Sequence, residues 1–450
     1  MSFQTIAQAA SALSAGSVTA TQLVEEALDR IGNPGGEGSR AFVSVQASQA
    51  RAAAQAMDAL RRVGRAPSIW AGLPISIKDL YDQAGEITRA GSIALEDANP
   101  ASATAPAVAR LEQAGFIVLG RTNMSEFAFS GLGVNPHYGT PRSPWDRKVG
   151  RLPGGSSSGA AVATADGMGF AGLGSDTGGS CRIPAALCGI VGWKPTAQRV
   201  PLAGVLPLSS TLDSLGPLAR SVACCDLLDN VMSGEDIRHD NAVPAMRGLR
   251  FGVLQGYVAE GWDSHVTAAF ERTLSRLSAA GARIEGLSVP ELADIPAANA
   301  AGGFTAPEAW AWHRDLVARK RAAYDPRILA RILRGERMAA ADYIDLVQAR
   351  TRISAAIAQR TRAFDAIVMP TCPLIPPAIA EVGDEVAYNR INLLLLRNPS
   401  VANFLDRCAI SIPCHRPGDP PVGFTLMGEH MGDRPLLAAA AAVEAALAEP

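Results

Sequence analysis

Two glycine turns that carry serine residues lie close together in the first half of the chain. The first turn, Gly154–Gly159, reads GGSSSG, and the second, Gly178–Ser180, reads GGS. Glycine allows close approach of the backbone to a ligand, so serines in such turns can reach a substrate. A single lysine, Lys78, follows an apolar run in the segment GLPISIKDL. Two serines and a lysine could together activate a nucleophile without a histidine.

The chemistry open to these residues is acyl transfer through a serine. A serine hydroxyl attacks a carbonyl only after a base removes its proton, and lysine is such a base only where burial lowers its pKa. The apolar residues around Lys78 favour burial, whereas pairing with the adjacent Asp79 would oppose the shift. In this interpretation Ser180 is the nucleophile, and Ser156 carries the proton between Ser180 and Lys78. The spacing alone equally allows two turn serines and a surface lysine.

The residues that lead into Ser180 could supply an oxyanion hole. The successive backbone N–H groups of Thr177, Gly178, Gly179 and Ser180 could converge on one oxygen atom. Such donors each contribute roughly 2.7–4 kcal/mol at the transition state. The same segment therefore offers both a nucleophile and the groups that would stabilise the charge it creates.

Two other motifs predict different chemistry and are disfavoured. GSSSG matches the nucleophile-elbow pattern with Ser157 at its centre, but the six histidines all lie in polar or charged neighbourhoods. GMGFAG at 167–172 matches a dinucleotide-binding pattern, but an Ala-rich helical segment precedes it where a strand is needed. No HExxH and no paired cysteines are present, so we expect neither a metal nor a cofactor.

Composition limits the partners of the chain. A net charge of −2 over 450 residues, without a basic stripe or an acidic tail, disfavours direct binding to nucleic acid or to a membrane surface. The seven scattered cysteines are typical of a reducing compartment. The N-terminus does not read as a signal peptide, and no apolar run reaches 18 residues. We therefore expect a cytoplasmic protein whose partner is a small molecule.

Helical and strand patterns alternate along the chain, which predicts an α/β layer architecture. Strands are predicted at 73–77, 116–120, 190–193, 249–254, 366–369, 409–413 and 422–427. Helices are predicted as a pair within 3–31 and at 44–63, 104–114, 160–165, 263–280, 327–334, 339–361 and 434–447. The polar segment 230–248 is predicted to be a surface connection.

Several segments together resemble the amidase signature family. They are GLPISIKDL around the lysine, RTNMSEFAFSG at 121–131, GTPRSPWDRKVGRLPGGSSSG at 139–159 and GLGSDTGGSCRIPAALCGIVGWKPT at 172–196. Weaker similarity continues through FDAIVMPTCP at 364–373 to AISIPC and PVGFTLMG. The resemblance therefore covers nearly the whole chain.

The resemblance implies a fold, a reaction and a set of roles. The fold is a single α/β/α sandwich domain over 1–450 around a large mixed sheet, with a signature core at about 65–220 and a variable half at about 230–450. The reaction is hydrolysis of a carboxylic amide through an acyl-enzyme on Ser180, with Ser156, preceded by a cis peptide bond, and Lys78 completing the triad. Asp176 and Arg182 match positions that brace the nucleophile loop.

The substrate pocket is harder to predict. The resemblance places its walls in the segment after TNMSEF and in the variable half, which implies Phe127, Ser130, Gly131 and Arg331. In relatives, an arginine in the helix of Arg331 can pair with a substrate carboxylate. Ordinary core aromatics and a surface arginine remain open alternatives. Further aromatic candidates are Phe129, Phe304, Trp310 and Trp312.

Two alternative functions remain open. One is the glutaminase component of a tRNA amidotransferase, which works with a second protein and binds the glutamine amino group through an acidic residue. This chain has Leu395 and Leu396 in that neighbourhood, which favours a stand-alone amidase, with a homodimer as one state left open. The other alternative is a catalytically dead binding module, although Lys78, Ser156 and Ser180 are all present.

Overall fold

An 11-stranded mixed sheet forms the centre of the structure, a computed structural model that describes residues 5–235 and 243–448. The strand order is β1-β3-β2-β4-β6-β5-β10-β11-β9-β7-β8. The strands are β1 (Phe42–Val45), β2 (Pro74–Lys78), β3 (Ile117–Thr122), β4 (Ala171–Asp176), β5 (Val191–Lys194), β6 (Ser214–Ala219), β7 (Arg250–Leu254), β8 (Arg283–Leu287), β9 (Ala366–Pro370), β10 (Ala409–Pro413) and β11 (Gly423–Met427). One continuous sheet thus unites strands from both halves of the chain.

Helices cover the sheet on both sides. The α-helices are α1 (Ile6–Ser14), α2 (Ala20–Gly32), α3 (Gly38–Ala41), α4 (Ala47–Arg62), α5 (Pro106–Gln113), α6 (Ser158–Ala165), α7 (Arg182–Cys188), α8 (Val222–Ser233), α9 (Ser264–Ala279), α10 (Ile295–Ala298), α11 (Thr305–Lys320), α12 (Pro326–Arg334), α13 (Ala340–Thr361), α14 (Glu385–Arg397), α15 (Ser400–Phe404) and α16 (Asp433–Ala448). Short 3-10 helices are η1 (Ile93–Leu95), η2 (Glu126–Ala128), η3 (Pro290–Asp294), η4 (Arg321–Ala323), η5 (Gly335–Arg337) and η6 (Ile379–Val382). The predicted α/β sandwich with a large mixed sheet is confirmed.

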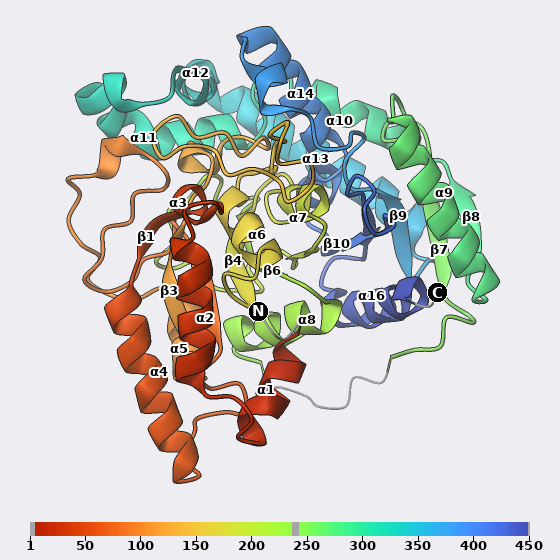
Figure 1. Cartoon of the computed structure of the whole chain (residues 1–450). Helices are drawn as coiled ribbons and strands as arrows, with labels where there is room; N and C mark the ends of the chain where they lie inside the picture. The colour runs from red at the N-terminus through yellow and green to blue at the C-terminus, as the bar shows by residue number, and fades with distance from the viewer. Residues whose placement is uncertain (1–4, 236–242, 449–450) are drawn as a thin grey trace.

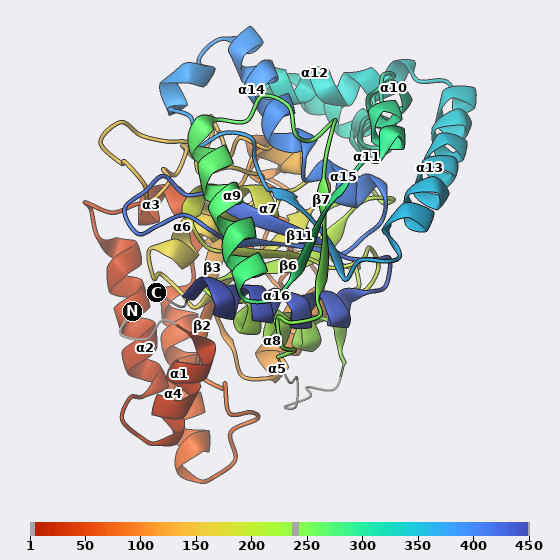
Figure 2. The same ribbon diagram turned by 90° about the vertical axis from the view of Figure 1, so that its right-hand side faces the viewer.

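The helices fall into groups with different positions. Helices α6 and α7 pack on one side of the central strands, and α8 and α16 lie on the other (Figures 1 and 2). Helices α10 to α14 gather together at the upper side of both views, away from α8 and α16. The first group supports the sheet, and the second group stands beside one end of it.

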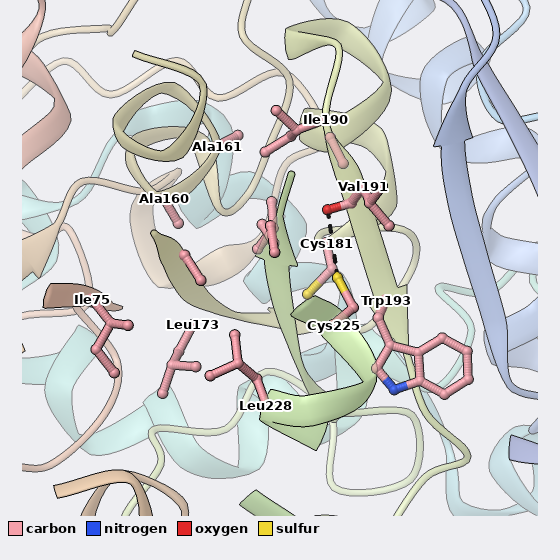
Figure 3. Packing of buried hydrophobic residues seen from close by; sticks show 14 of the residues in the cluster. Ile75, Ala160, Ala161, Leu173, Cys181, Ile190, Val191, Trp193, Cys225 and Leu228 are labelled. Atoms are coloured by element: carbon pink, nitrogen blue, oxygen red, sulfur yellow. Dashed lines mark hydrogen bonds between the residues drawn. The ribbon is translucent and has the colours of Figure 1, made fainter. Parts of the chain in front are cut away.

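Close packing in the core depends on small residues (Figure 3). A Cβ at Gly172 of β4 would lie 2.8 Å from Cβ of Ala160 in α6, and one at Gly216 of β6 would lie 2.0 Å from the carbonyl oxygen of Trp193. Glycine is required at both positions because a backbone or helix approaches there. Figure 3 shows the side chains that fill the surrounding space, among them Ile75, Ala161, Leu173, Cys181, Ile190, Val191, Cys225 and Leu228.

Most predicted elements are present in the structure. Thr19 caps α2 through a capping box with Gln22, and Gly281 follows the end of α9 at a φ of 103°. Two strands were not predicted, β4 and β6, and the predicted helix at 44–63 was wrong at its start, where β1 ends at Val45. The predicted connection 230–248 was wrong as far as Ser233, which ends α8; its part 236–242 lies outside the described residues, as do residues 3–4 of the first predicted helix.

Some predicted absences can be compared with the described part of the chain. No helix there is long and apolar enough to cross a membrane. Residues 5–235 and 243–448 contain no group of three or more His, Cys, Asp or Glu side chains placed to hold a metal ion. The GMGFAG segment follows helix α6 and leads into strand β4, which is the reverse of the strand-then-helix order of a dinucleotide site.

Candidate active site

The site lies where two neighbouring parallel strands end. Strand β2 pairs with β4 in parallel, with Ile77 opposite Leu173, and both strands run toward the same edge of the sheet. Lys78 is the last residue of β2, while Ser175 and Asp176 end β4. Carboxyl ends of adjacent parallel strands are a common location for ligand sites. The topology therefore brings together residues that lie about a hundred positions apart in sequence.

Lys78 is fully buried and its amine contacts two hydroxyls. Its Nζ donates to Ser156 Oγ at 2.6 Å and to Ser175 Oγ at 2.9 Å. Burial lowers the pKa of Lys78 to about 8. The neighbouring Asp79 does not pair with Lys78, because it accepts a hydrogen bond from Arg121 Nε at 2.7 Å. The one residue that could have kept the lysine charged is thus occupied elsewhere.

The first serine turn leads directly from this lysine toward the second turn. The peptide bond Gly155–Ser156 is cis. Ser157, at the centre of the elbow-like pattern, points its hydroxyl at the carbonyl oxygen of Ser175, 3.4 Å away. Its backbone N–H donates to the carbonyl oxygen of Ser180 at 3.3 Å. The two turns therefore meet, with Ser156 against the lysine and Ser157 against the backbone of β4.

The second turn is held by the carboxylate of Asp176. This buried carboxylate accepts hydrogen bonds from the backbone N–H groups of Gly179 (2.8 Å) and Cys181 (3.1 Å) and from Arg182 Nε and Nη2 (both 3.0 Å). Asn403, from α15, donates to the same carboxylate at 2.9 Å and accepts from Arg182. Burial alone would raise the pKa of Asp176, but the Arg182 guanidinium outweighs burial and holds it well below its ordinary value.

The Asp176→Asn variant is expected to lose about 3–5 kcal/mol of free energy of unfolding, because it leaves the buried Arg182 charge without its partner. It also turns an amide N–H₂ toward groups that are themselves donors. Chemical denaturation of the purified variant measures the loss. Glu291→Gln is the matched control, since it removes a carboxylate from an exposed pair with Arg360 and should change stability far less. Equal losses in the two variants would contradict this prediction.

The loop between Asp176 and Ser180 is anchored on a second carboxylate. Thr177 donates its hydroxyl to Asp213, which immediately precedes β6, the antiparallel neighbour of β4. Asp213 also accepts the N–H groups of Leu208 and Ser209, and burial raises its pKa to about 6. Within the loop, the N–H of Gly179 is already bonded to Asp176, whereas Thr177, Gly178 and Ser180 line a cavity.

This cavity has a volume of about 280 Å³ and connects the second turn to the helices α11 to α14. Its walls come from five further segments: 128–130, 208–212, 299–306, 331–334 and 392–404. Two arginines line it, and none of the described lining residues is an aspartate or a glutamate. The remaining lining groups are amide, hydroxyl and hydrocarbon. An acyl group seated here would meet a surface that is apolar with a positive end.

The predicted pocket residues divide into two groups. Ser130 and Arg331 line the cavity, and Arg331 donates to the carbonyl oxygen of Phe129 and to Asn389 Oδ1 (3.2 Å). Phe127 and Gly131 are not among the lining residues. Phe127 instead packs in an aromatic cluster with His313, at a ring distance of 4.4 Å. Its neighbour Phe129 lines the cavity, and so does Phe304, whereas Trp310 and Trp312 do not.

Sequence reasoning missed four polar residues of this region. Ser175 contacts the lysine, Asn403 and Asp213 brace the second turn, and Asn392 lines the cavity. Ser175 could have been found from the position of a strand end in the segment before Asp176. The other three belong to elements distant in sequence, and no local pattern marks them.

Comparison with known proteins places this geometry in a family. A family model described as Amidase matches residues 22–437. The chain therefore belongs to the amidase family, the amidase signature family that its motifs resemble. It is 35% identical over 413 residues to 2-amino-5-chloromuconic acid deaminase of Comamonas testosteroni, covering 91% of this chain and 89% of the relative.

Two other relatives show the same breadth. The A component of the glutamyl-tRNA(Gln) amidotransferase of Chromohalobacter salexigens is 33% identical over 471 residues, covering 97% of this chain and 95% of that protein. A crystal structure of an amidase superposes with a TM-score of 0.88 at 32% identity, over 98% of this chain and 99% of the other. The chain is thus similar both to stand-alone enzymes and to one component of an assembly.

Proposed function

We propose that the chain is a stand-alone amidase that hydrolyses a carboxylic amide to an acid and ammonia or an amine through an acyl-enzyme on Ser180. The observation that carries this proposal is the buried Lys78 amine, 2.6 Å from Ser156 Oγ, beneath the turn whose Ser180 faces the cavity. A lysine without a carboxylate partner and with a lowered pKa can serve as a base. Turnover of simple amides by the purified protein, with release of ammonia, tests the proposal.

The reaction follows from these positions. Ser180 Oγ attacks the amide carbon while its proton passes to Ser156 Oγ, and the proton of Ser156 passes to neutral Lys78. The N–H groups of Thr177, Gly178 and Ser180 are the donors proposed for the oxyanion, because the N–H of Gly179 is bonded to Asp176. Lys78 then returns a proton through Ser156 to the leaving nitrogen, and water cleaves the ester by the reverse path.

The rate should depend on the protonation of Lys78. Because burial lowers the pKa of Lys78 to about 8, we expect kcat/KM for an amide to rise with pH and to level off above about pH 8. Below that pH the amine is charged and cannot accept the proton of Ser156. A pH–rate profile with a saturating amide measures the effect on kcat, and one at low substrate measures it on kcat/KM. A kcat/KM that falls as the pH rises from 7 to 8 would exclude Lys78 as the base.

Leu396 favours the stand-alone enzyme over the amidotransferase component. That component is implied to bind the glutamine amino group through an acidic residue in this neighbourhood. Here Leu396 lines the cavity, and its Cδ2 would lie 3.4 Å from a Cβ at Gly178, while Leu395 is buried away from it. A hydrocarbon at this place cannot compensate an ammonium group. Glutaminase activity that emerges only in the presence of a second protein would reverse this choice.

The catalytically dead alternative is separated by a labelling experiment. A fluorophosphonate reacts with an activated serine and should label Ser180, which is reachable from the cavity. Absence of labelling in the folded protein would favour a binding module. We also propose a cytoplasmic location and a small-molecule amide as the physiological substrate.

A further inference from the structure

The side chain of Asn392, in the cavity wall formed by α14, can adopt only one amide orientation. Its Oδ1 accepts hydrogen bonds from Ser130 Oγ at 3.0 Å and from the backbone N–H of Gly131 at 2.8 Å. Tyr388 donates its hydroxyl to Ser130 Oγ at 2.8 Å, which leaves the Ser130 proton for Asn392. A flipped amide would set Nδ2 against the N–H of Gly131, donor against donor.

The fixed orientation leaves Nδ2 as a free donor. Asn392 is almost fully buried and lines the cavity, and none of the described residues accepts a hydrogen bond from its Nδ2. On the same helix, Leu393 and Leu396 also line the cavity, so the amide is a single donor between two hydrocarbon side chains. A buried donor without a partner costs free energy, which a substrate acceptor would recover.

The charges around the cavity indicate which acceptor fits. Arg331 and Arg334 line it, and the described lining includes no carboxylate. A cationic substrate group would lose its hydration without gaining an opposite charge, whereas an anionic one would meet both guanidinium and amide donors. The name of the Comamonas relative also refers to an acid.

From these contacts we infer that Asn392 determines specificity by donating from Nδ2 to a carboxylate oxygen on the acyl chain of the substrate. The substrate class is then the monoamide of a dicarboxylic acid. This inference rests on the proposed amidase function and narrows it to one kind of acyl group.

The Asn392→Asp variant tests the inference with little change of shape. An aspartate keeps an oxygen for Ser130 and Gly131 but replaces the cavity-facing donor with an anionic acceptor. The substrates are the ω-carboxyl amides malonamate, succinamate, glutaramate and adipamate, each compared with the neutral alkanamide of equal chain length. We expect the ratio of kcat/KM for the best ω-carboxyl amide to that for its neutral partner to fall at least tenfold, mainly through KM. The cationic 4-aminobutyramide should improve relative to butyramide.

Arg390→Gln is the matched control, because it makes the same change of net charge at an exposed position of α14. It should leave the substrate ratio unchanged. An Asn392→Asp ratio equal to that of the wild type, or a fall of equal size in Arg390→Gln, would overturn the inference.

The wild-type enzyme supplies an independent test if Asn392→Asp does not fold. It must prefer at least one ω-carboxyl amide to its neutral partner and to 4-aminobutyramide; equal rates would overturn the inference while the amidase function stands. Failure of the proposed function would look different: no amide would be hydrolysed and fluorophosphonate would not label Ser180.

Discussion

Replacing Ser180 with alanine is expected to abolish turnover of every amide and ester substrate. The change removes one hydroxyl oxygen, which no other group in the second turn can replace as a nucleophile. Losses on the order of 10⁶-fold are typical when a serine nucleophile is removed. The fold should survive, since the Ser180 carbonyl still accepts the N–H of Ser157 and Asp176 still holds the loop. Steady-state kinetics, with circular dichroism to verify folding, measure the effect.

Ser157→Ala is the control that makes this result specific. Ser157 is the serine that the nucleophile-elbow pattern would select, and within the described chain its hydroxyl donates to the carbonyl oxygen of Ser175 at 3.4 Å, a long hydrogen bond. Its loss should change kcat only slightly. Near-normal turnover by Ser180→Ala, or abolished turnover by a folded Ser157→Ala, would show that the nucleophile has been misassigned.

Removal of the Lys78 amine is expected to slow acylation by amides by several orders of magnitude and by esters much less. The amine takes the proton from Ser156 and returns it to the leaving group, and positioned acid–base groups contribute roughly 10²–10⁴-fold. An amide nitrogen must be protonated to leave, whereas an alkoxide or phenoxide leaves more readily. Single-turnover rates of Lys78→Ala for an amide and an ester of the same acyl group give the comparison.

Lys78→Met separates the chemistry from the packing. Lys78 is fully buried, so alanine leaves a void, whereas methionine fills most of the space without an amine. Both variants should show the same difference between amide and ester. Equal losses for the two substrate types would argue against Lys78 as the acid for the leaving group. A methionine variant that restores amide turnover would show that only packing had been lost.

The sequence predicted the α/β architecture because most strands carry ordinary apolar patterns. It missed β4 because Gly172 and Gly174 stand where a strand normally carries large side chains; α6 and β6 approach these glycines too closely for a Cβ. The catalytic candidates could be predicted since their motifs are local. The contacts among Lys78, Ser156 and Ser175 depend on strand pairing across a hundred residues, which no local pattern reveals.

The walls of the cavity could be predicted only by segment. Within the segment after TNMSEF, Phe127 and Ala128 both have positive φ angles, 50° and 60°. The backbone therefore abandons the alternation that would have told which side chain faces the substrate, and Phe129 rather than Phe127 lines the cavity. Asn392 and Arg331 come from separate helices, so their joint position depends on tertiary packing.

The separation between the sheet edge and the helices α10 to α14 has a consequence for how such an enzyme can diversify. The groups proposed for bond cleavage stand on β2, β4 and the turns beside them, whereas much of the surface around the acyl group belongs to α11, α12 and α14. Substitutions in those helices can alter the accepted acid without displacing Lys78 or Ser180. Substrate range and reaction type are therefore inherited from different parts of the chain, and a new specificity can arise while the old chemistry persists.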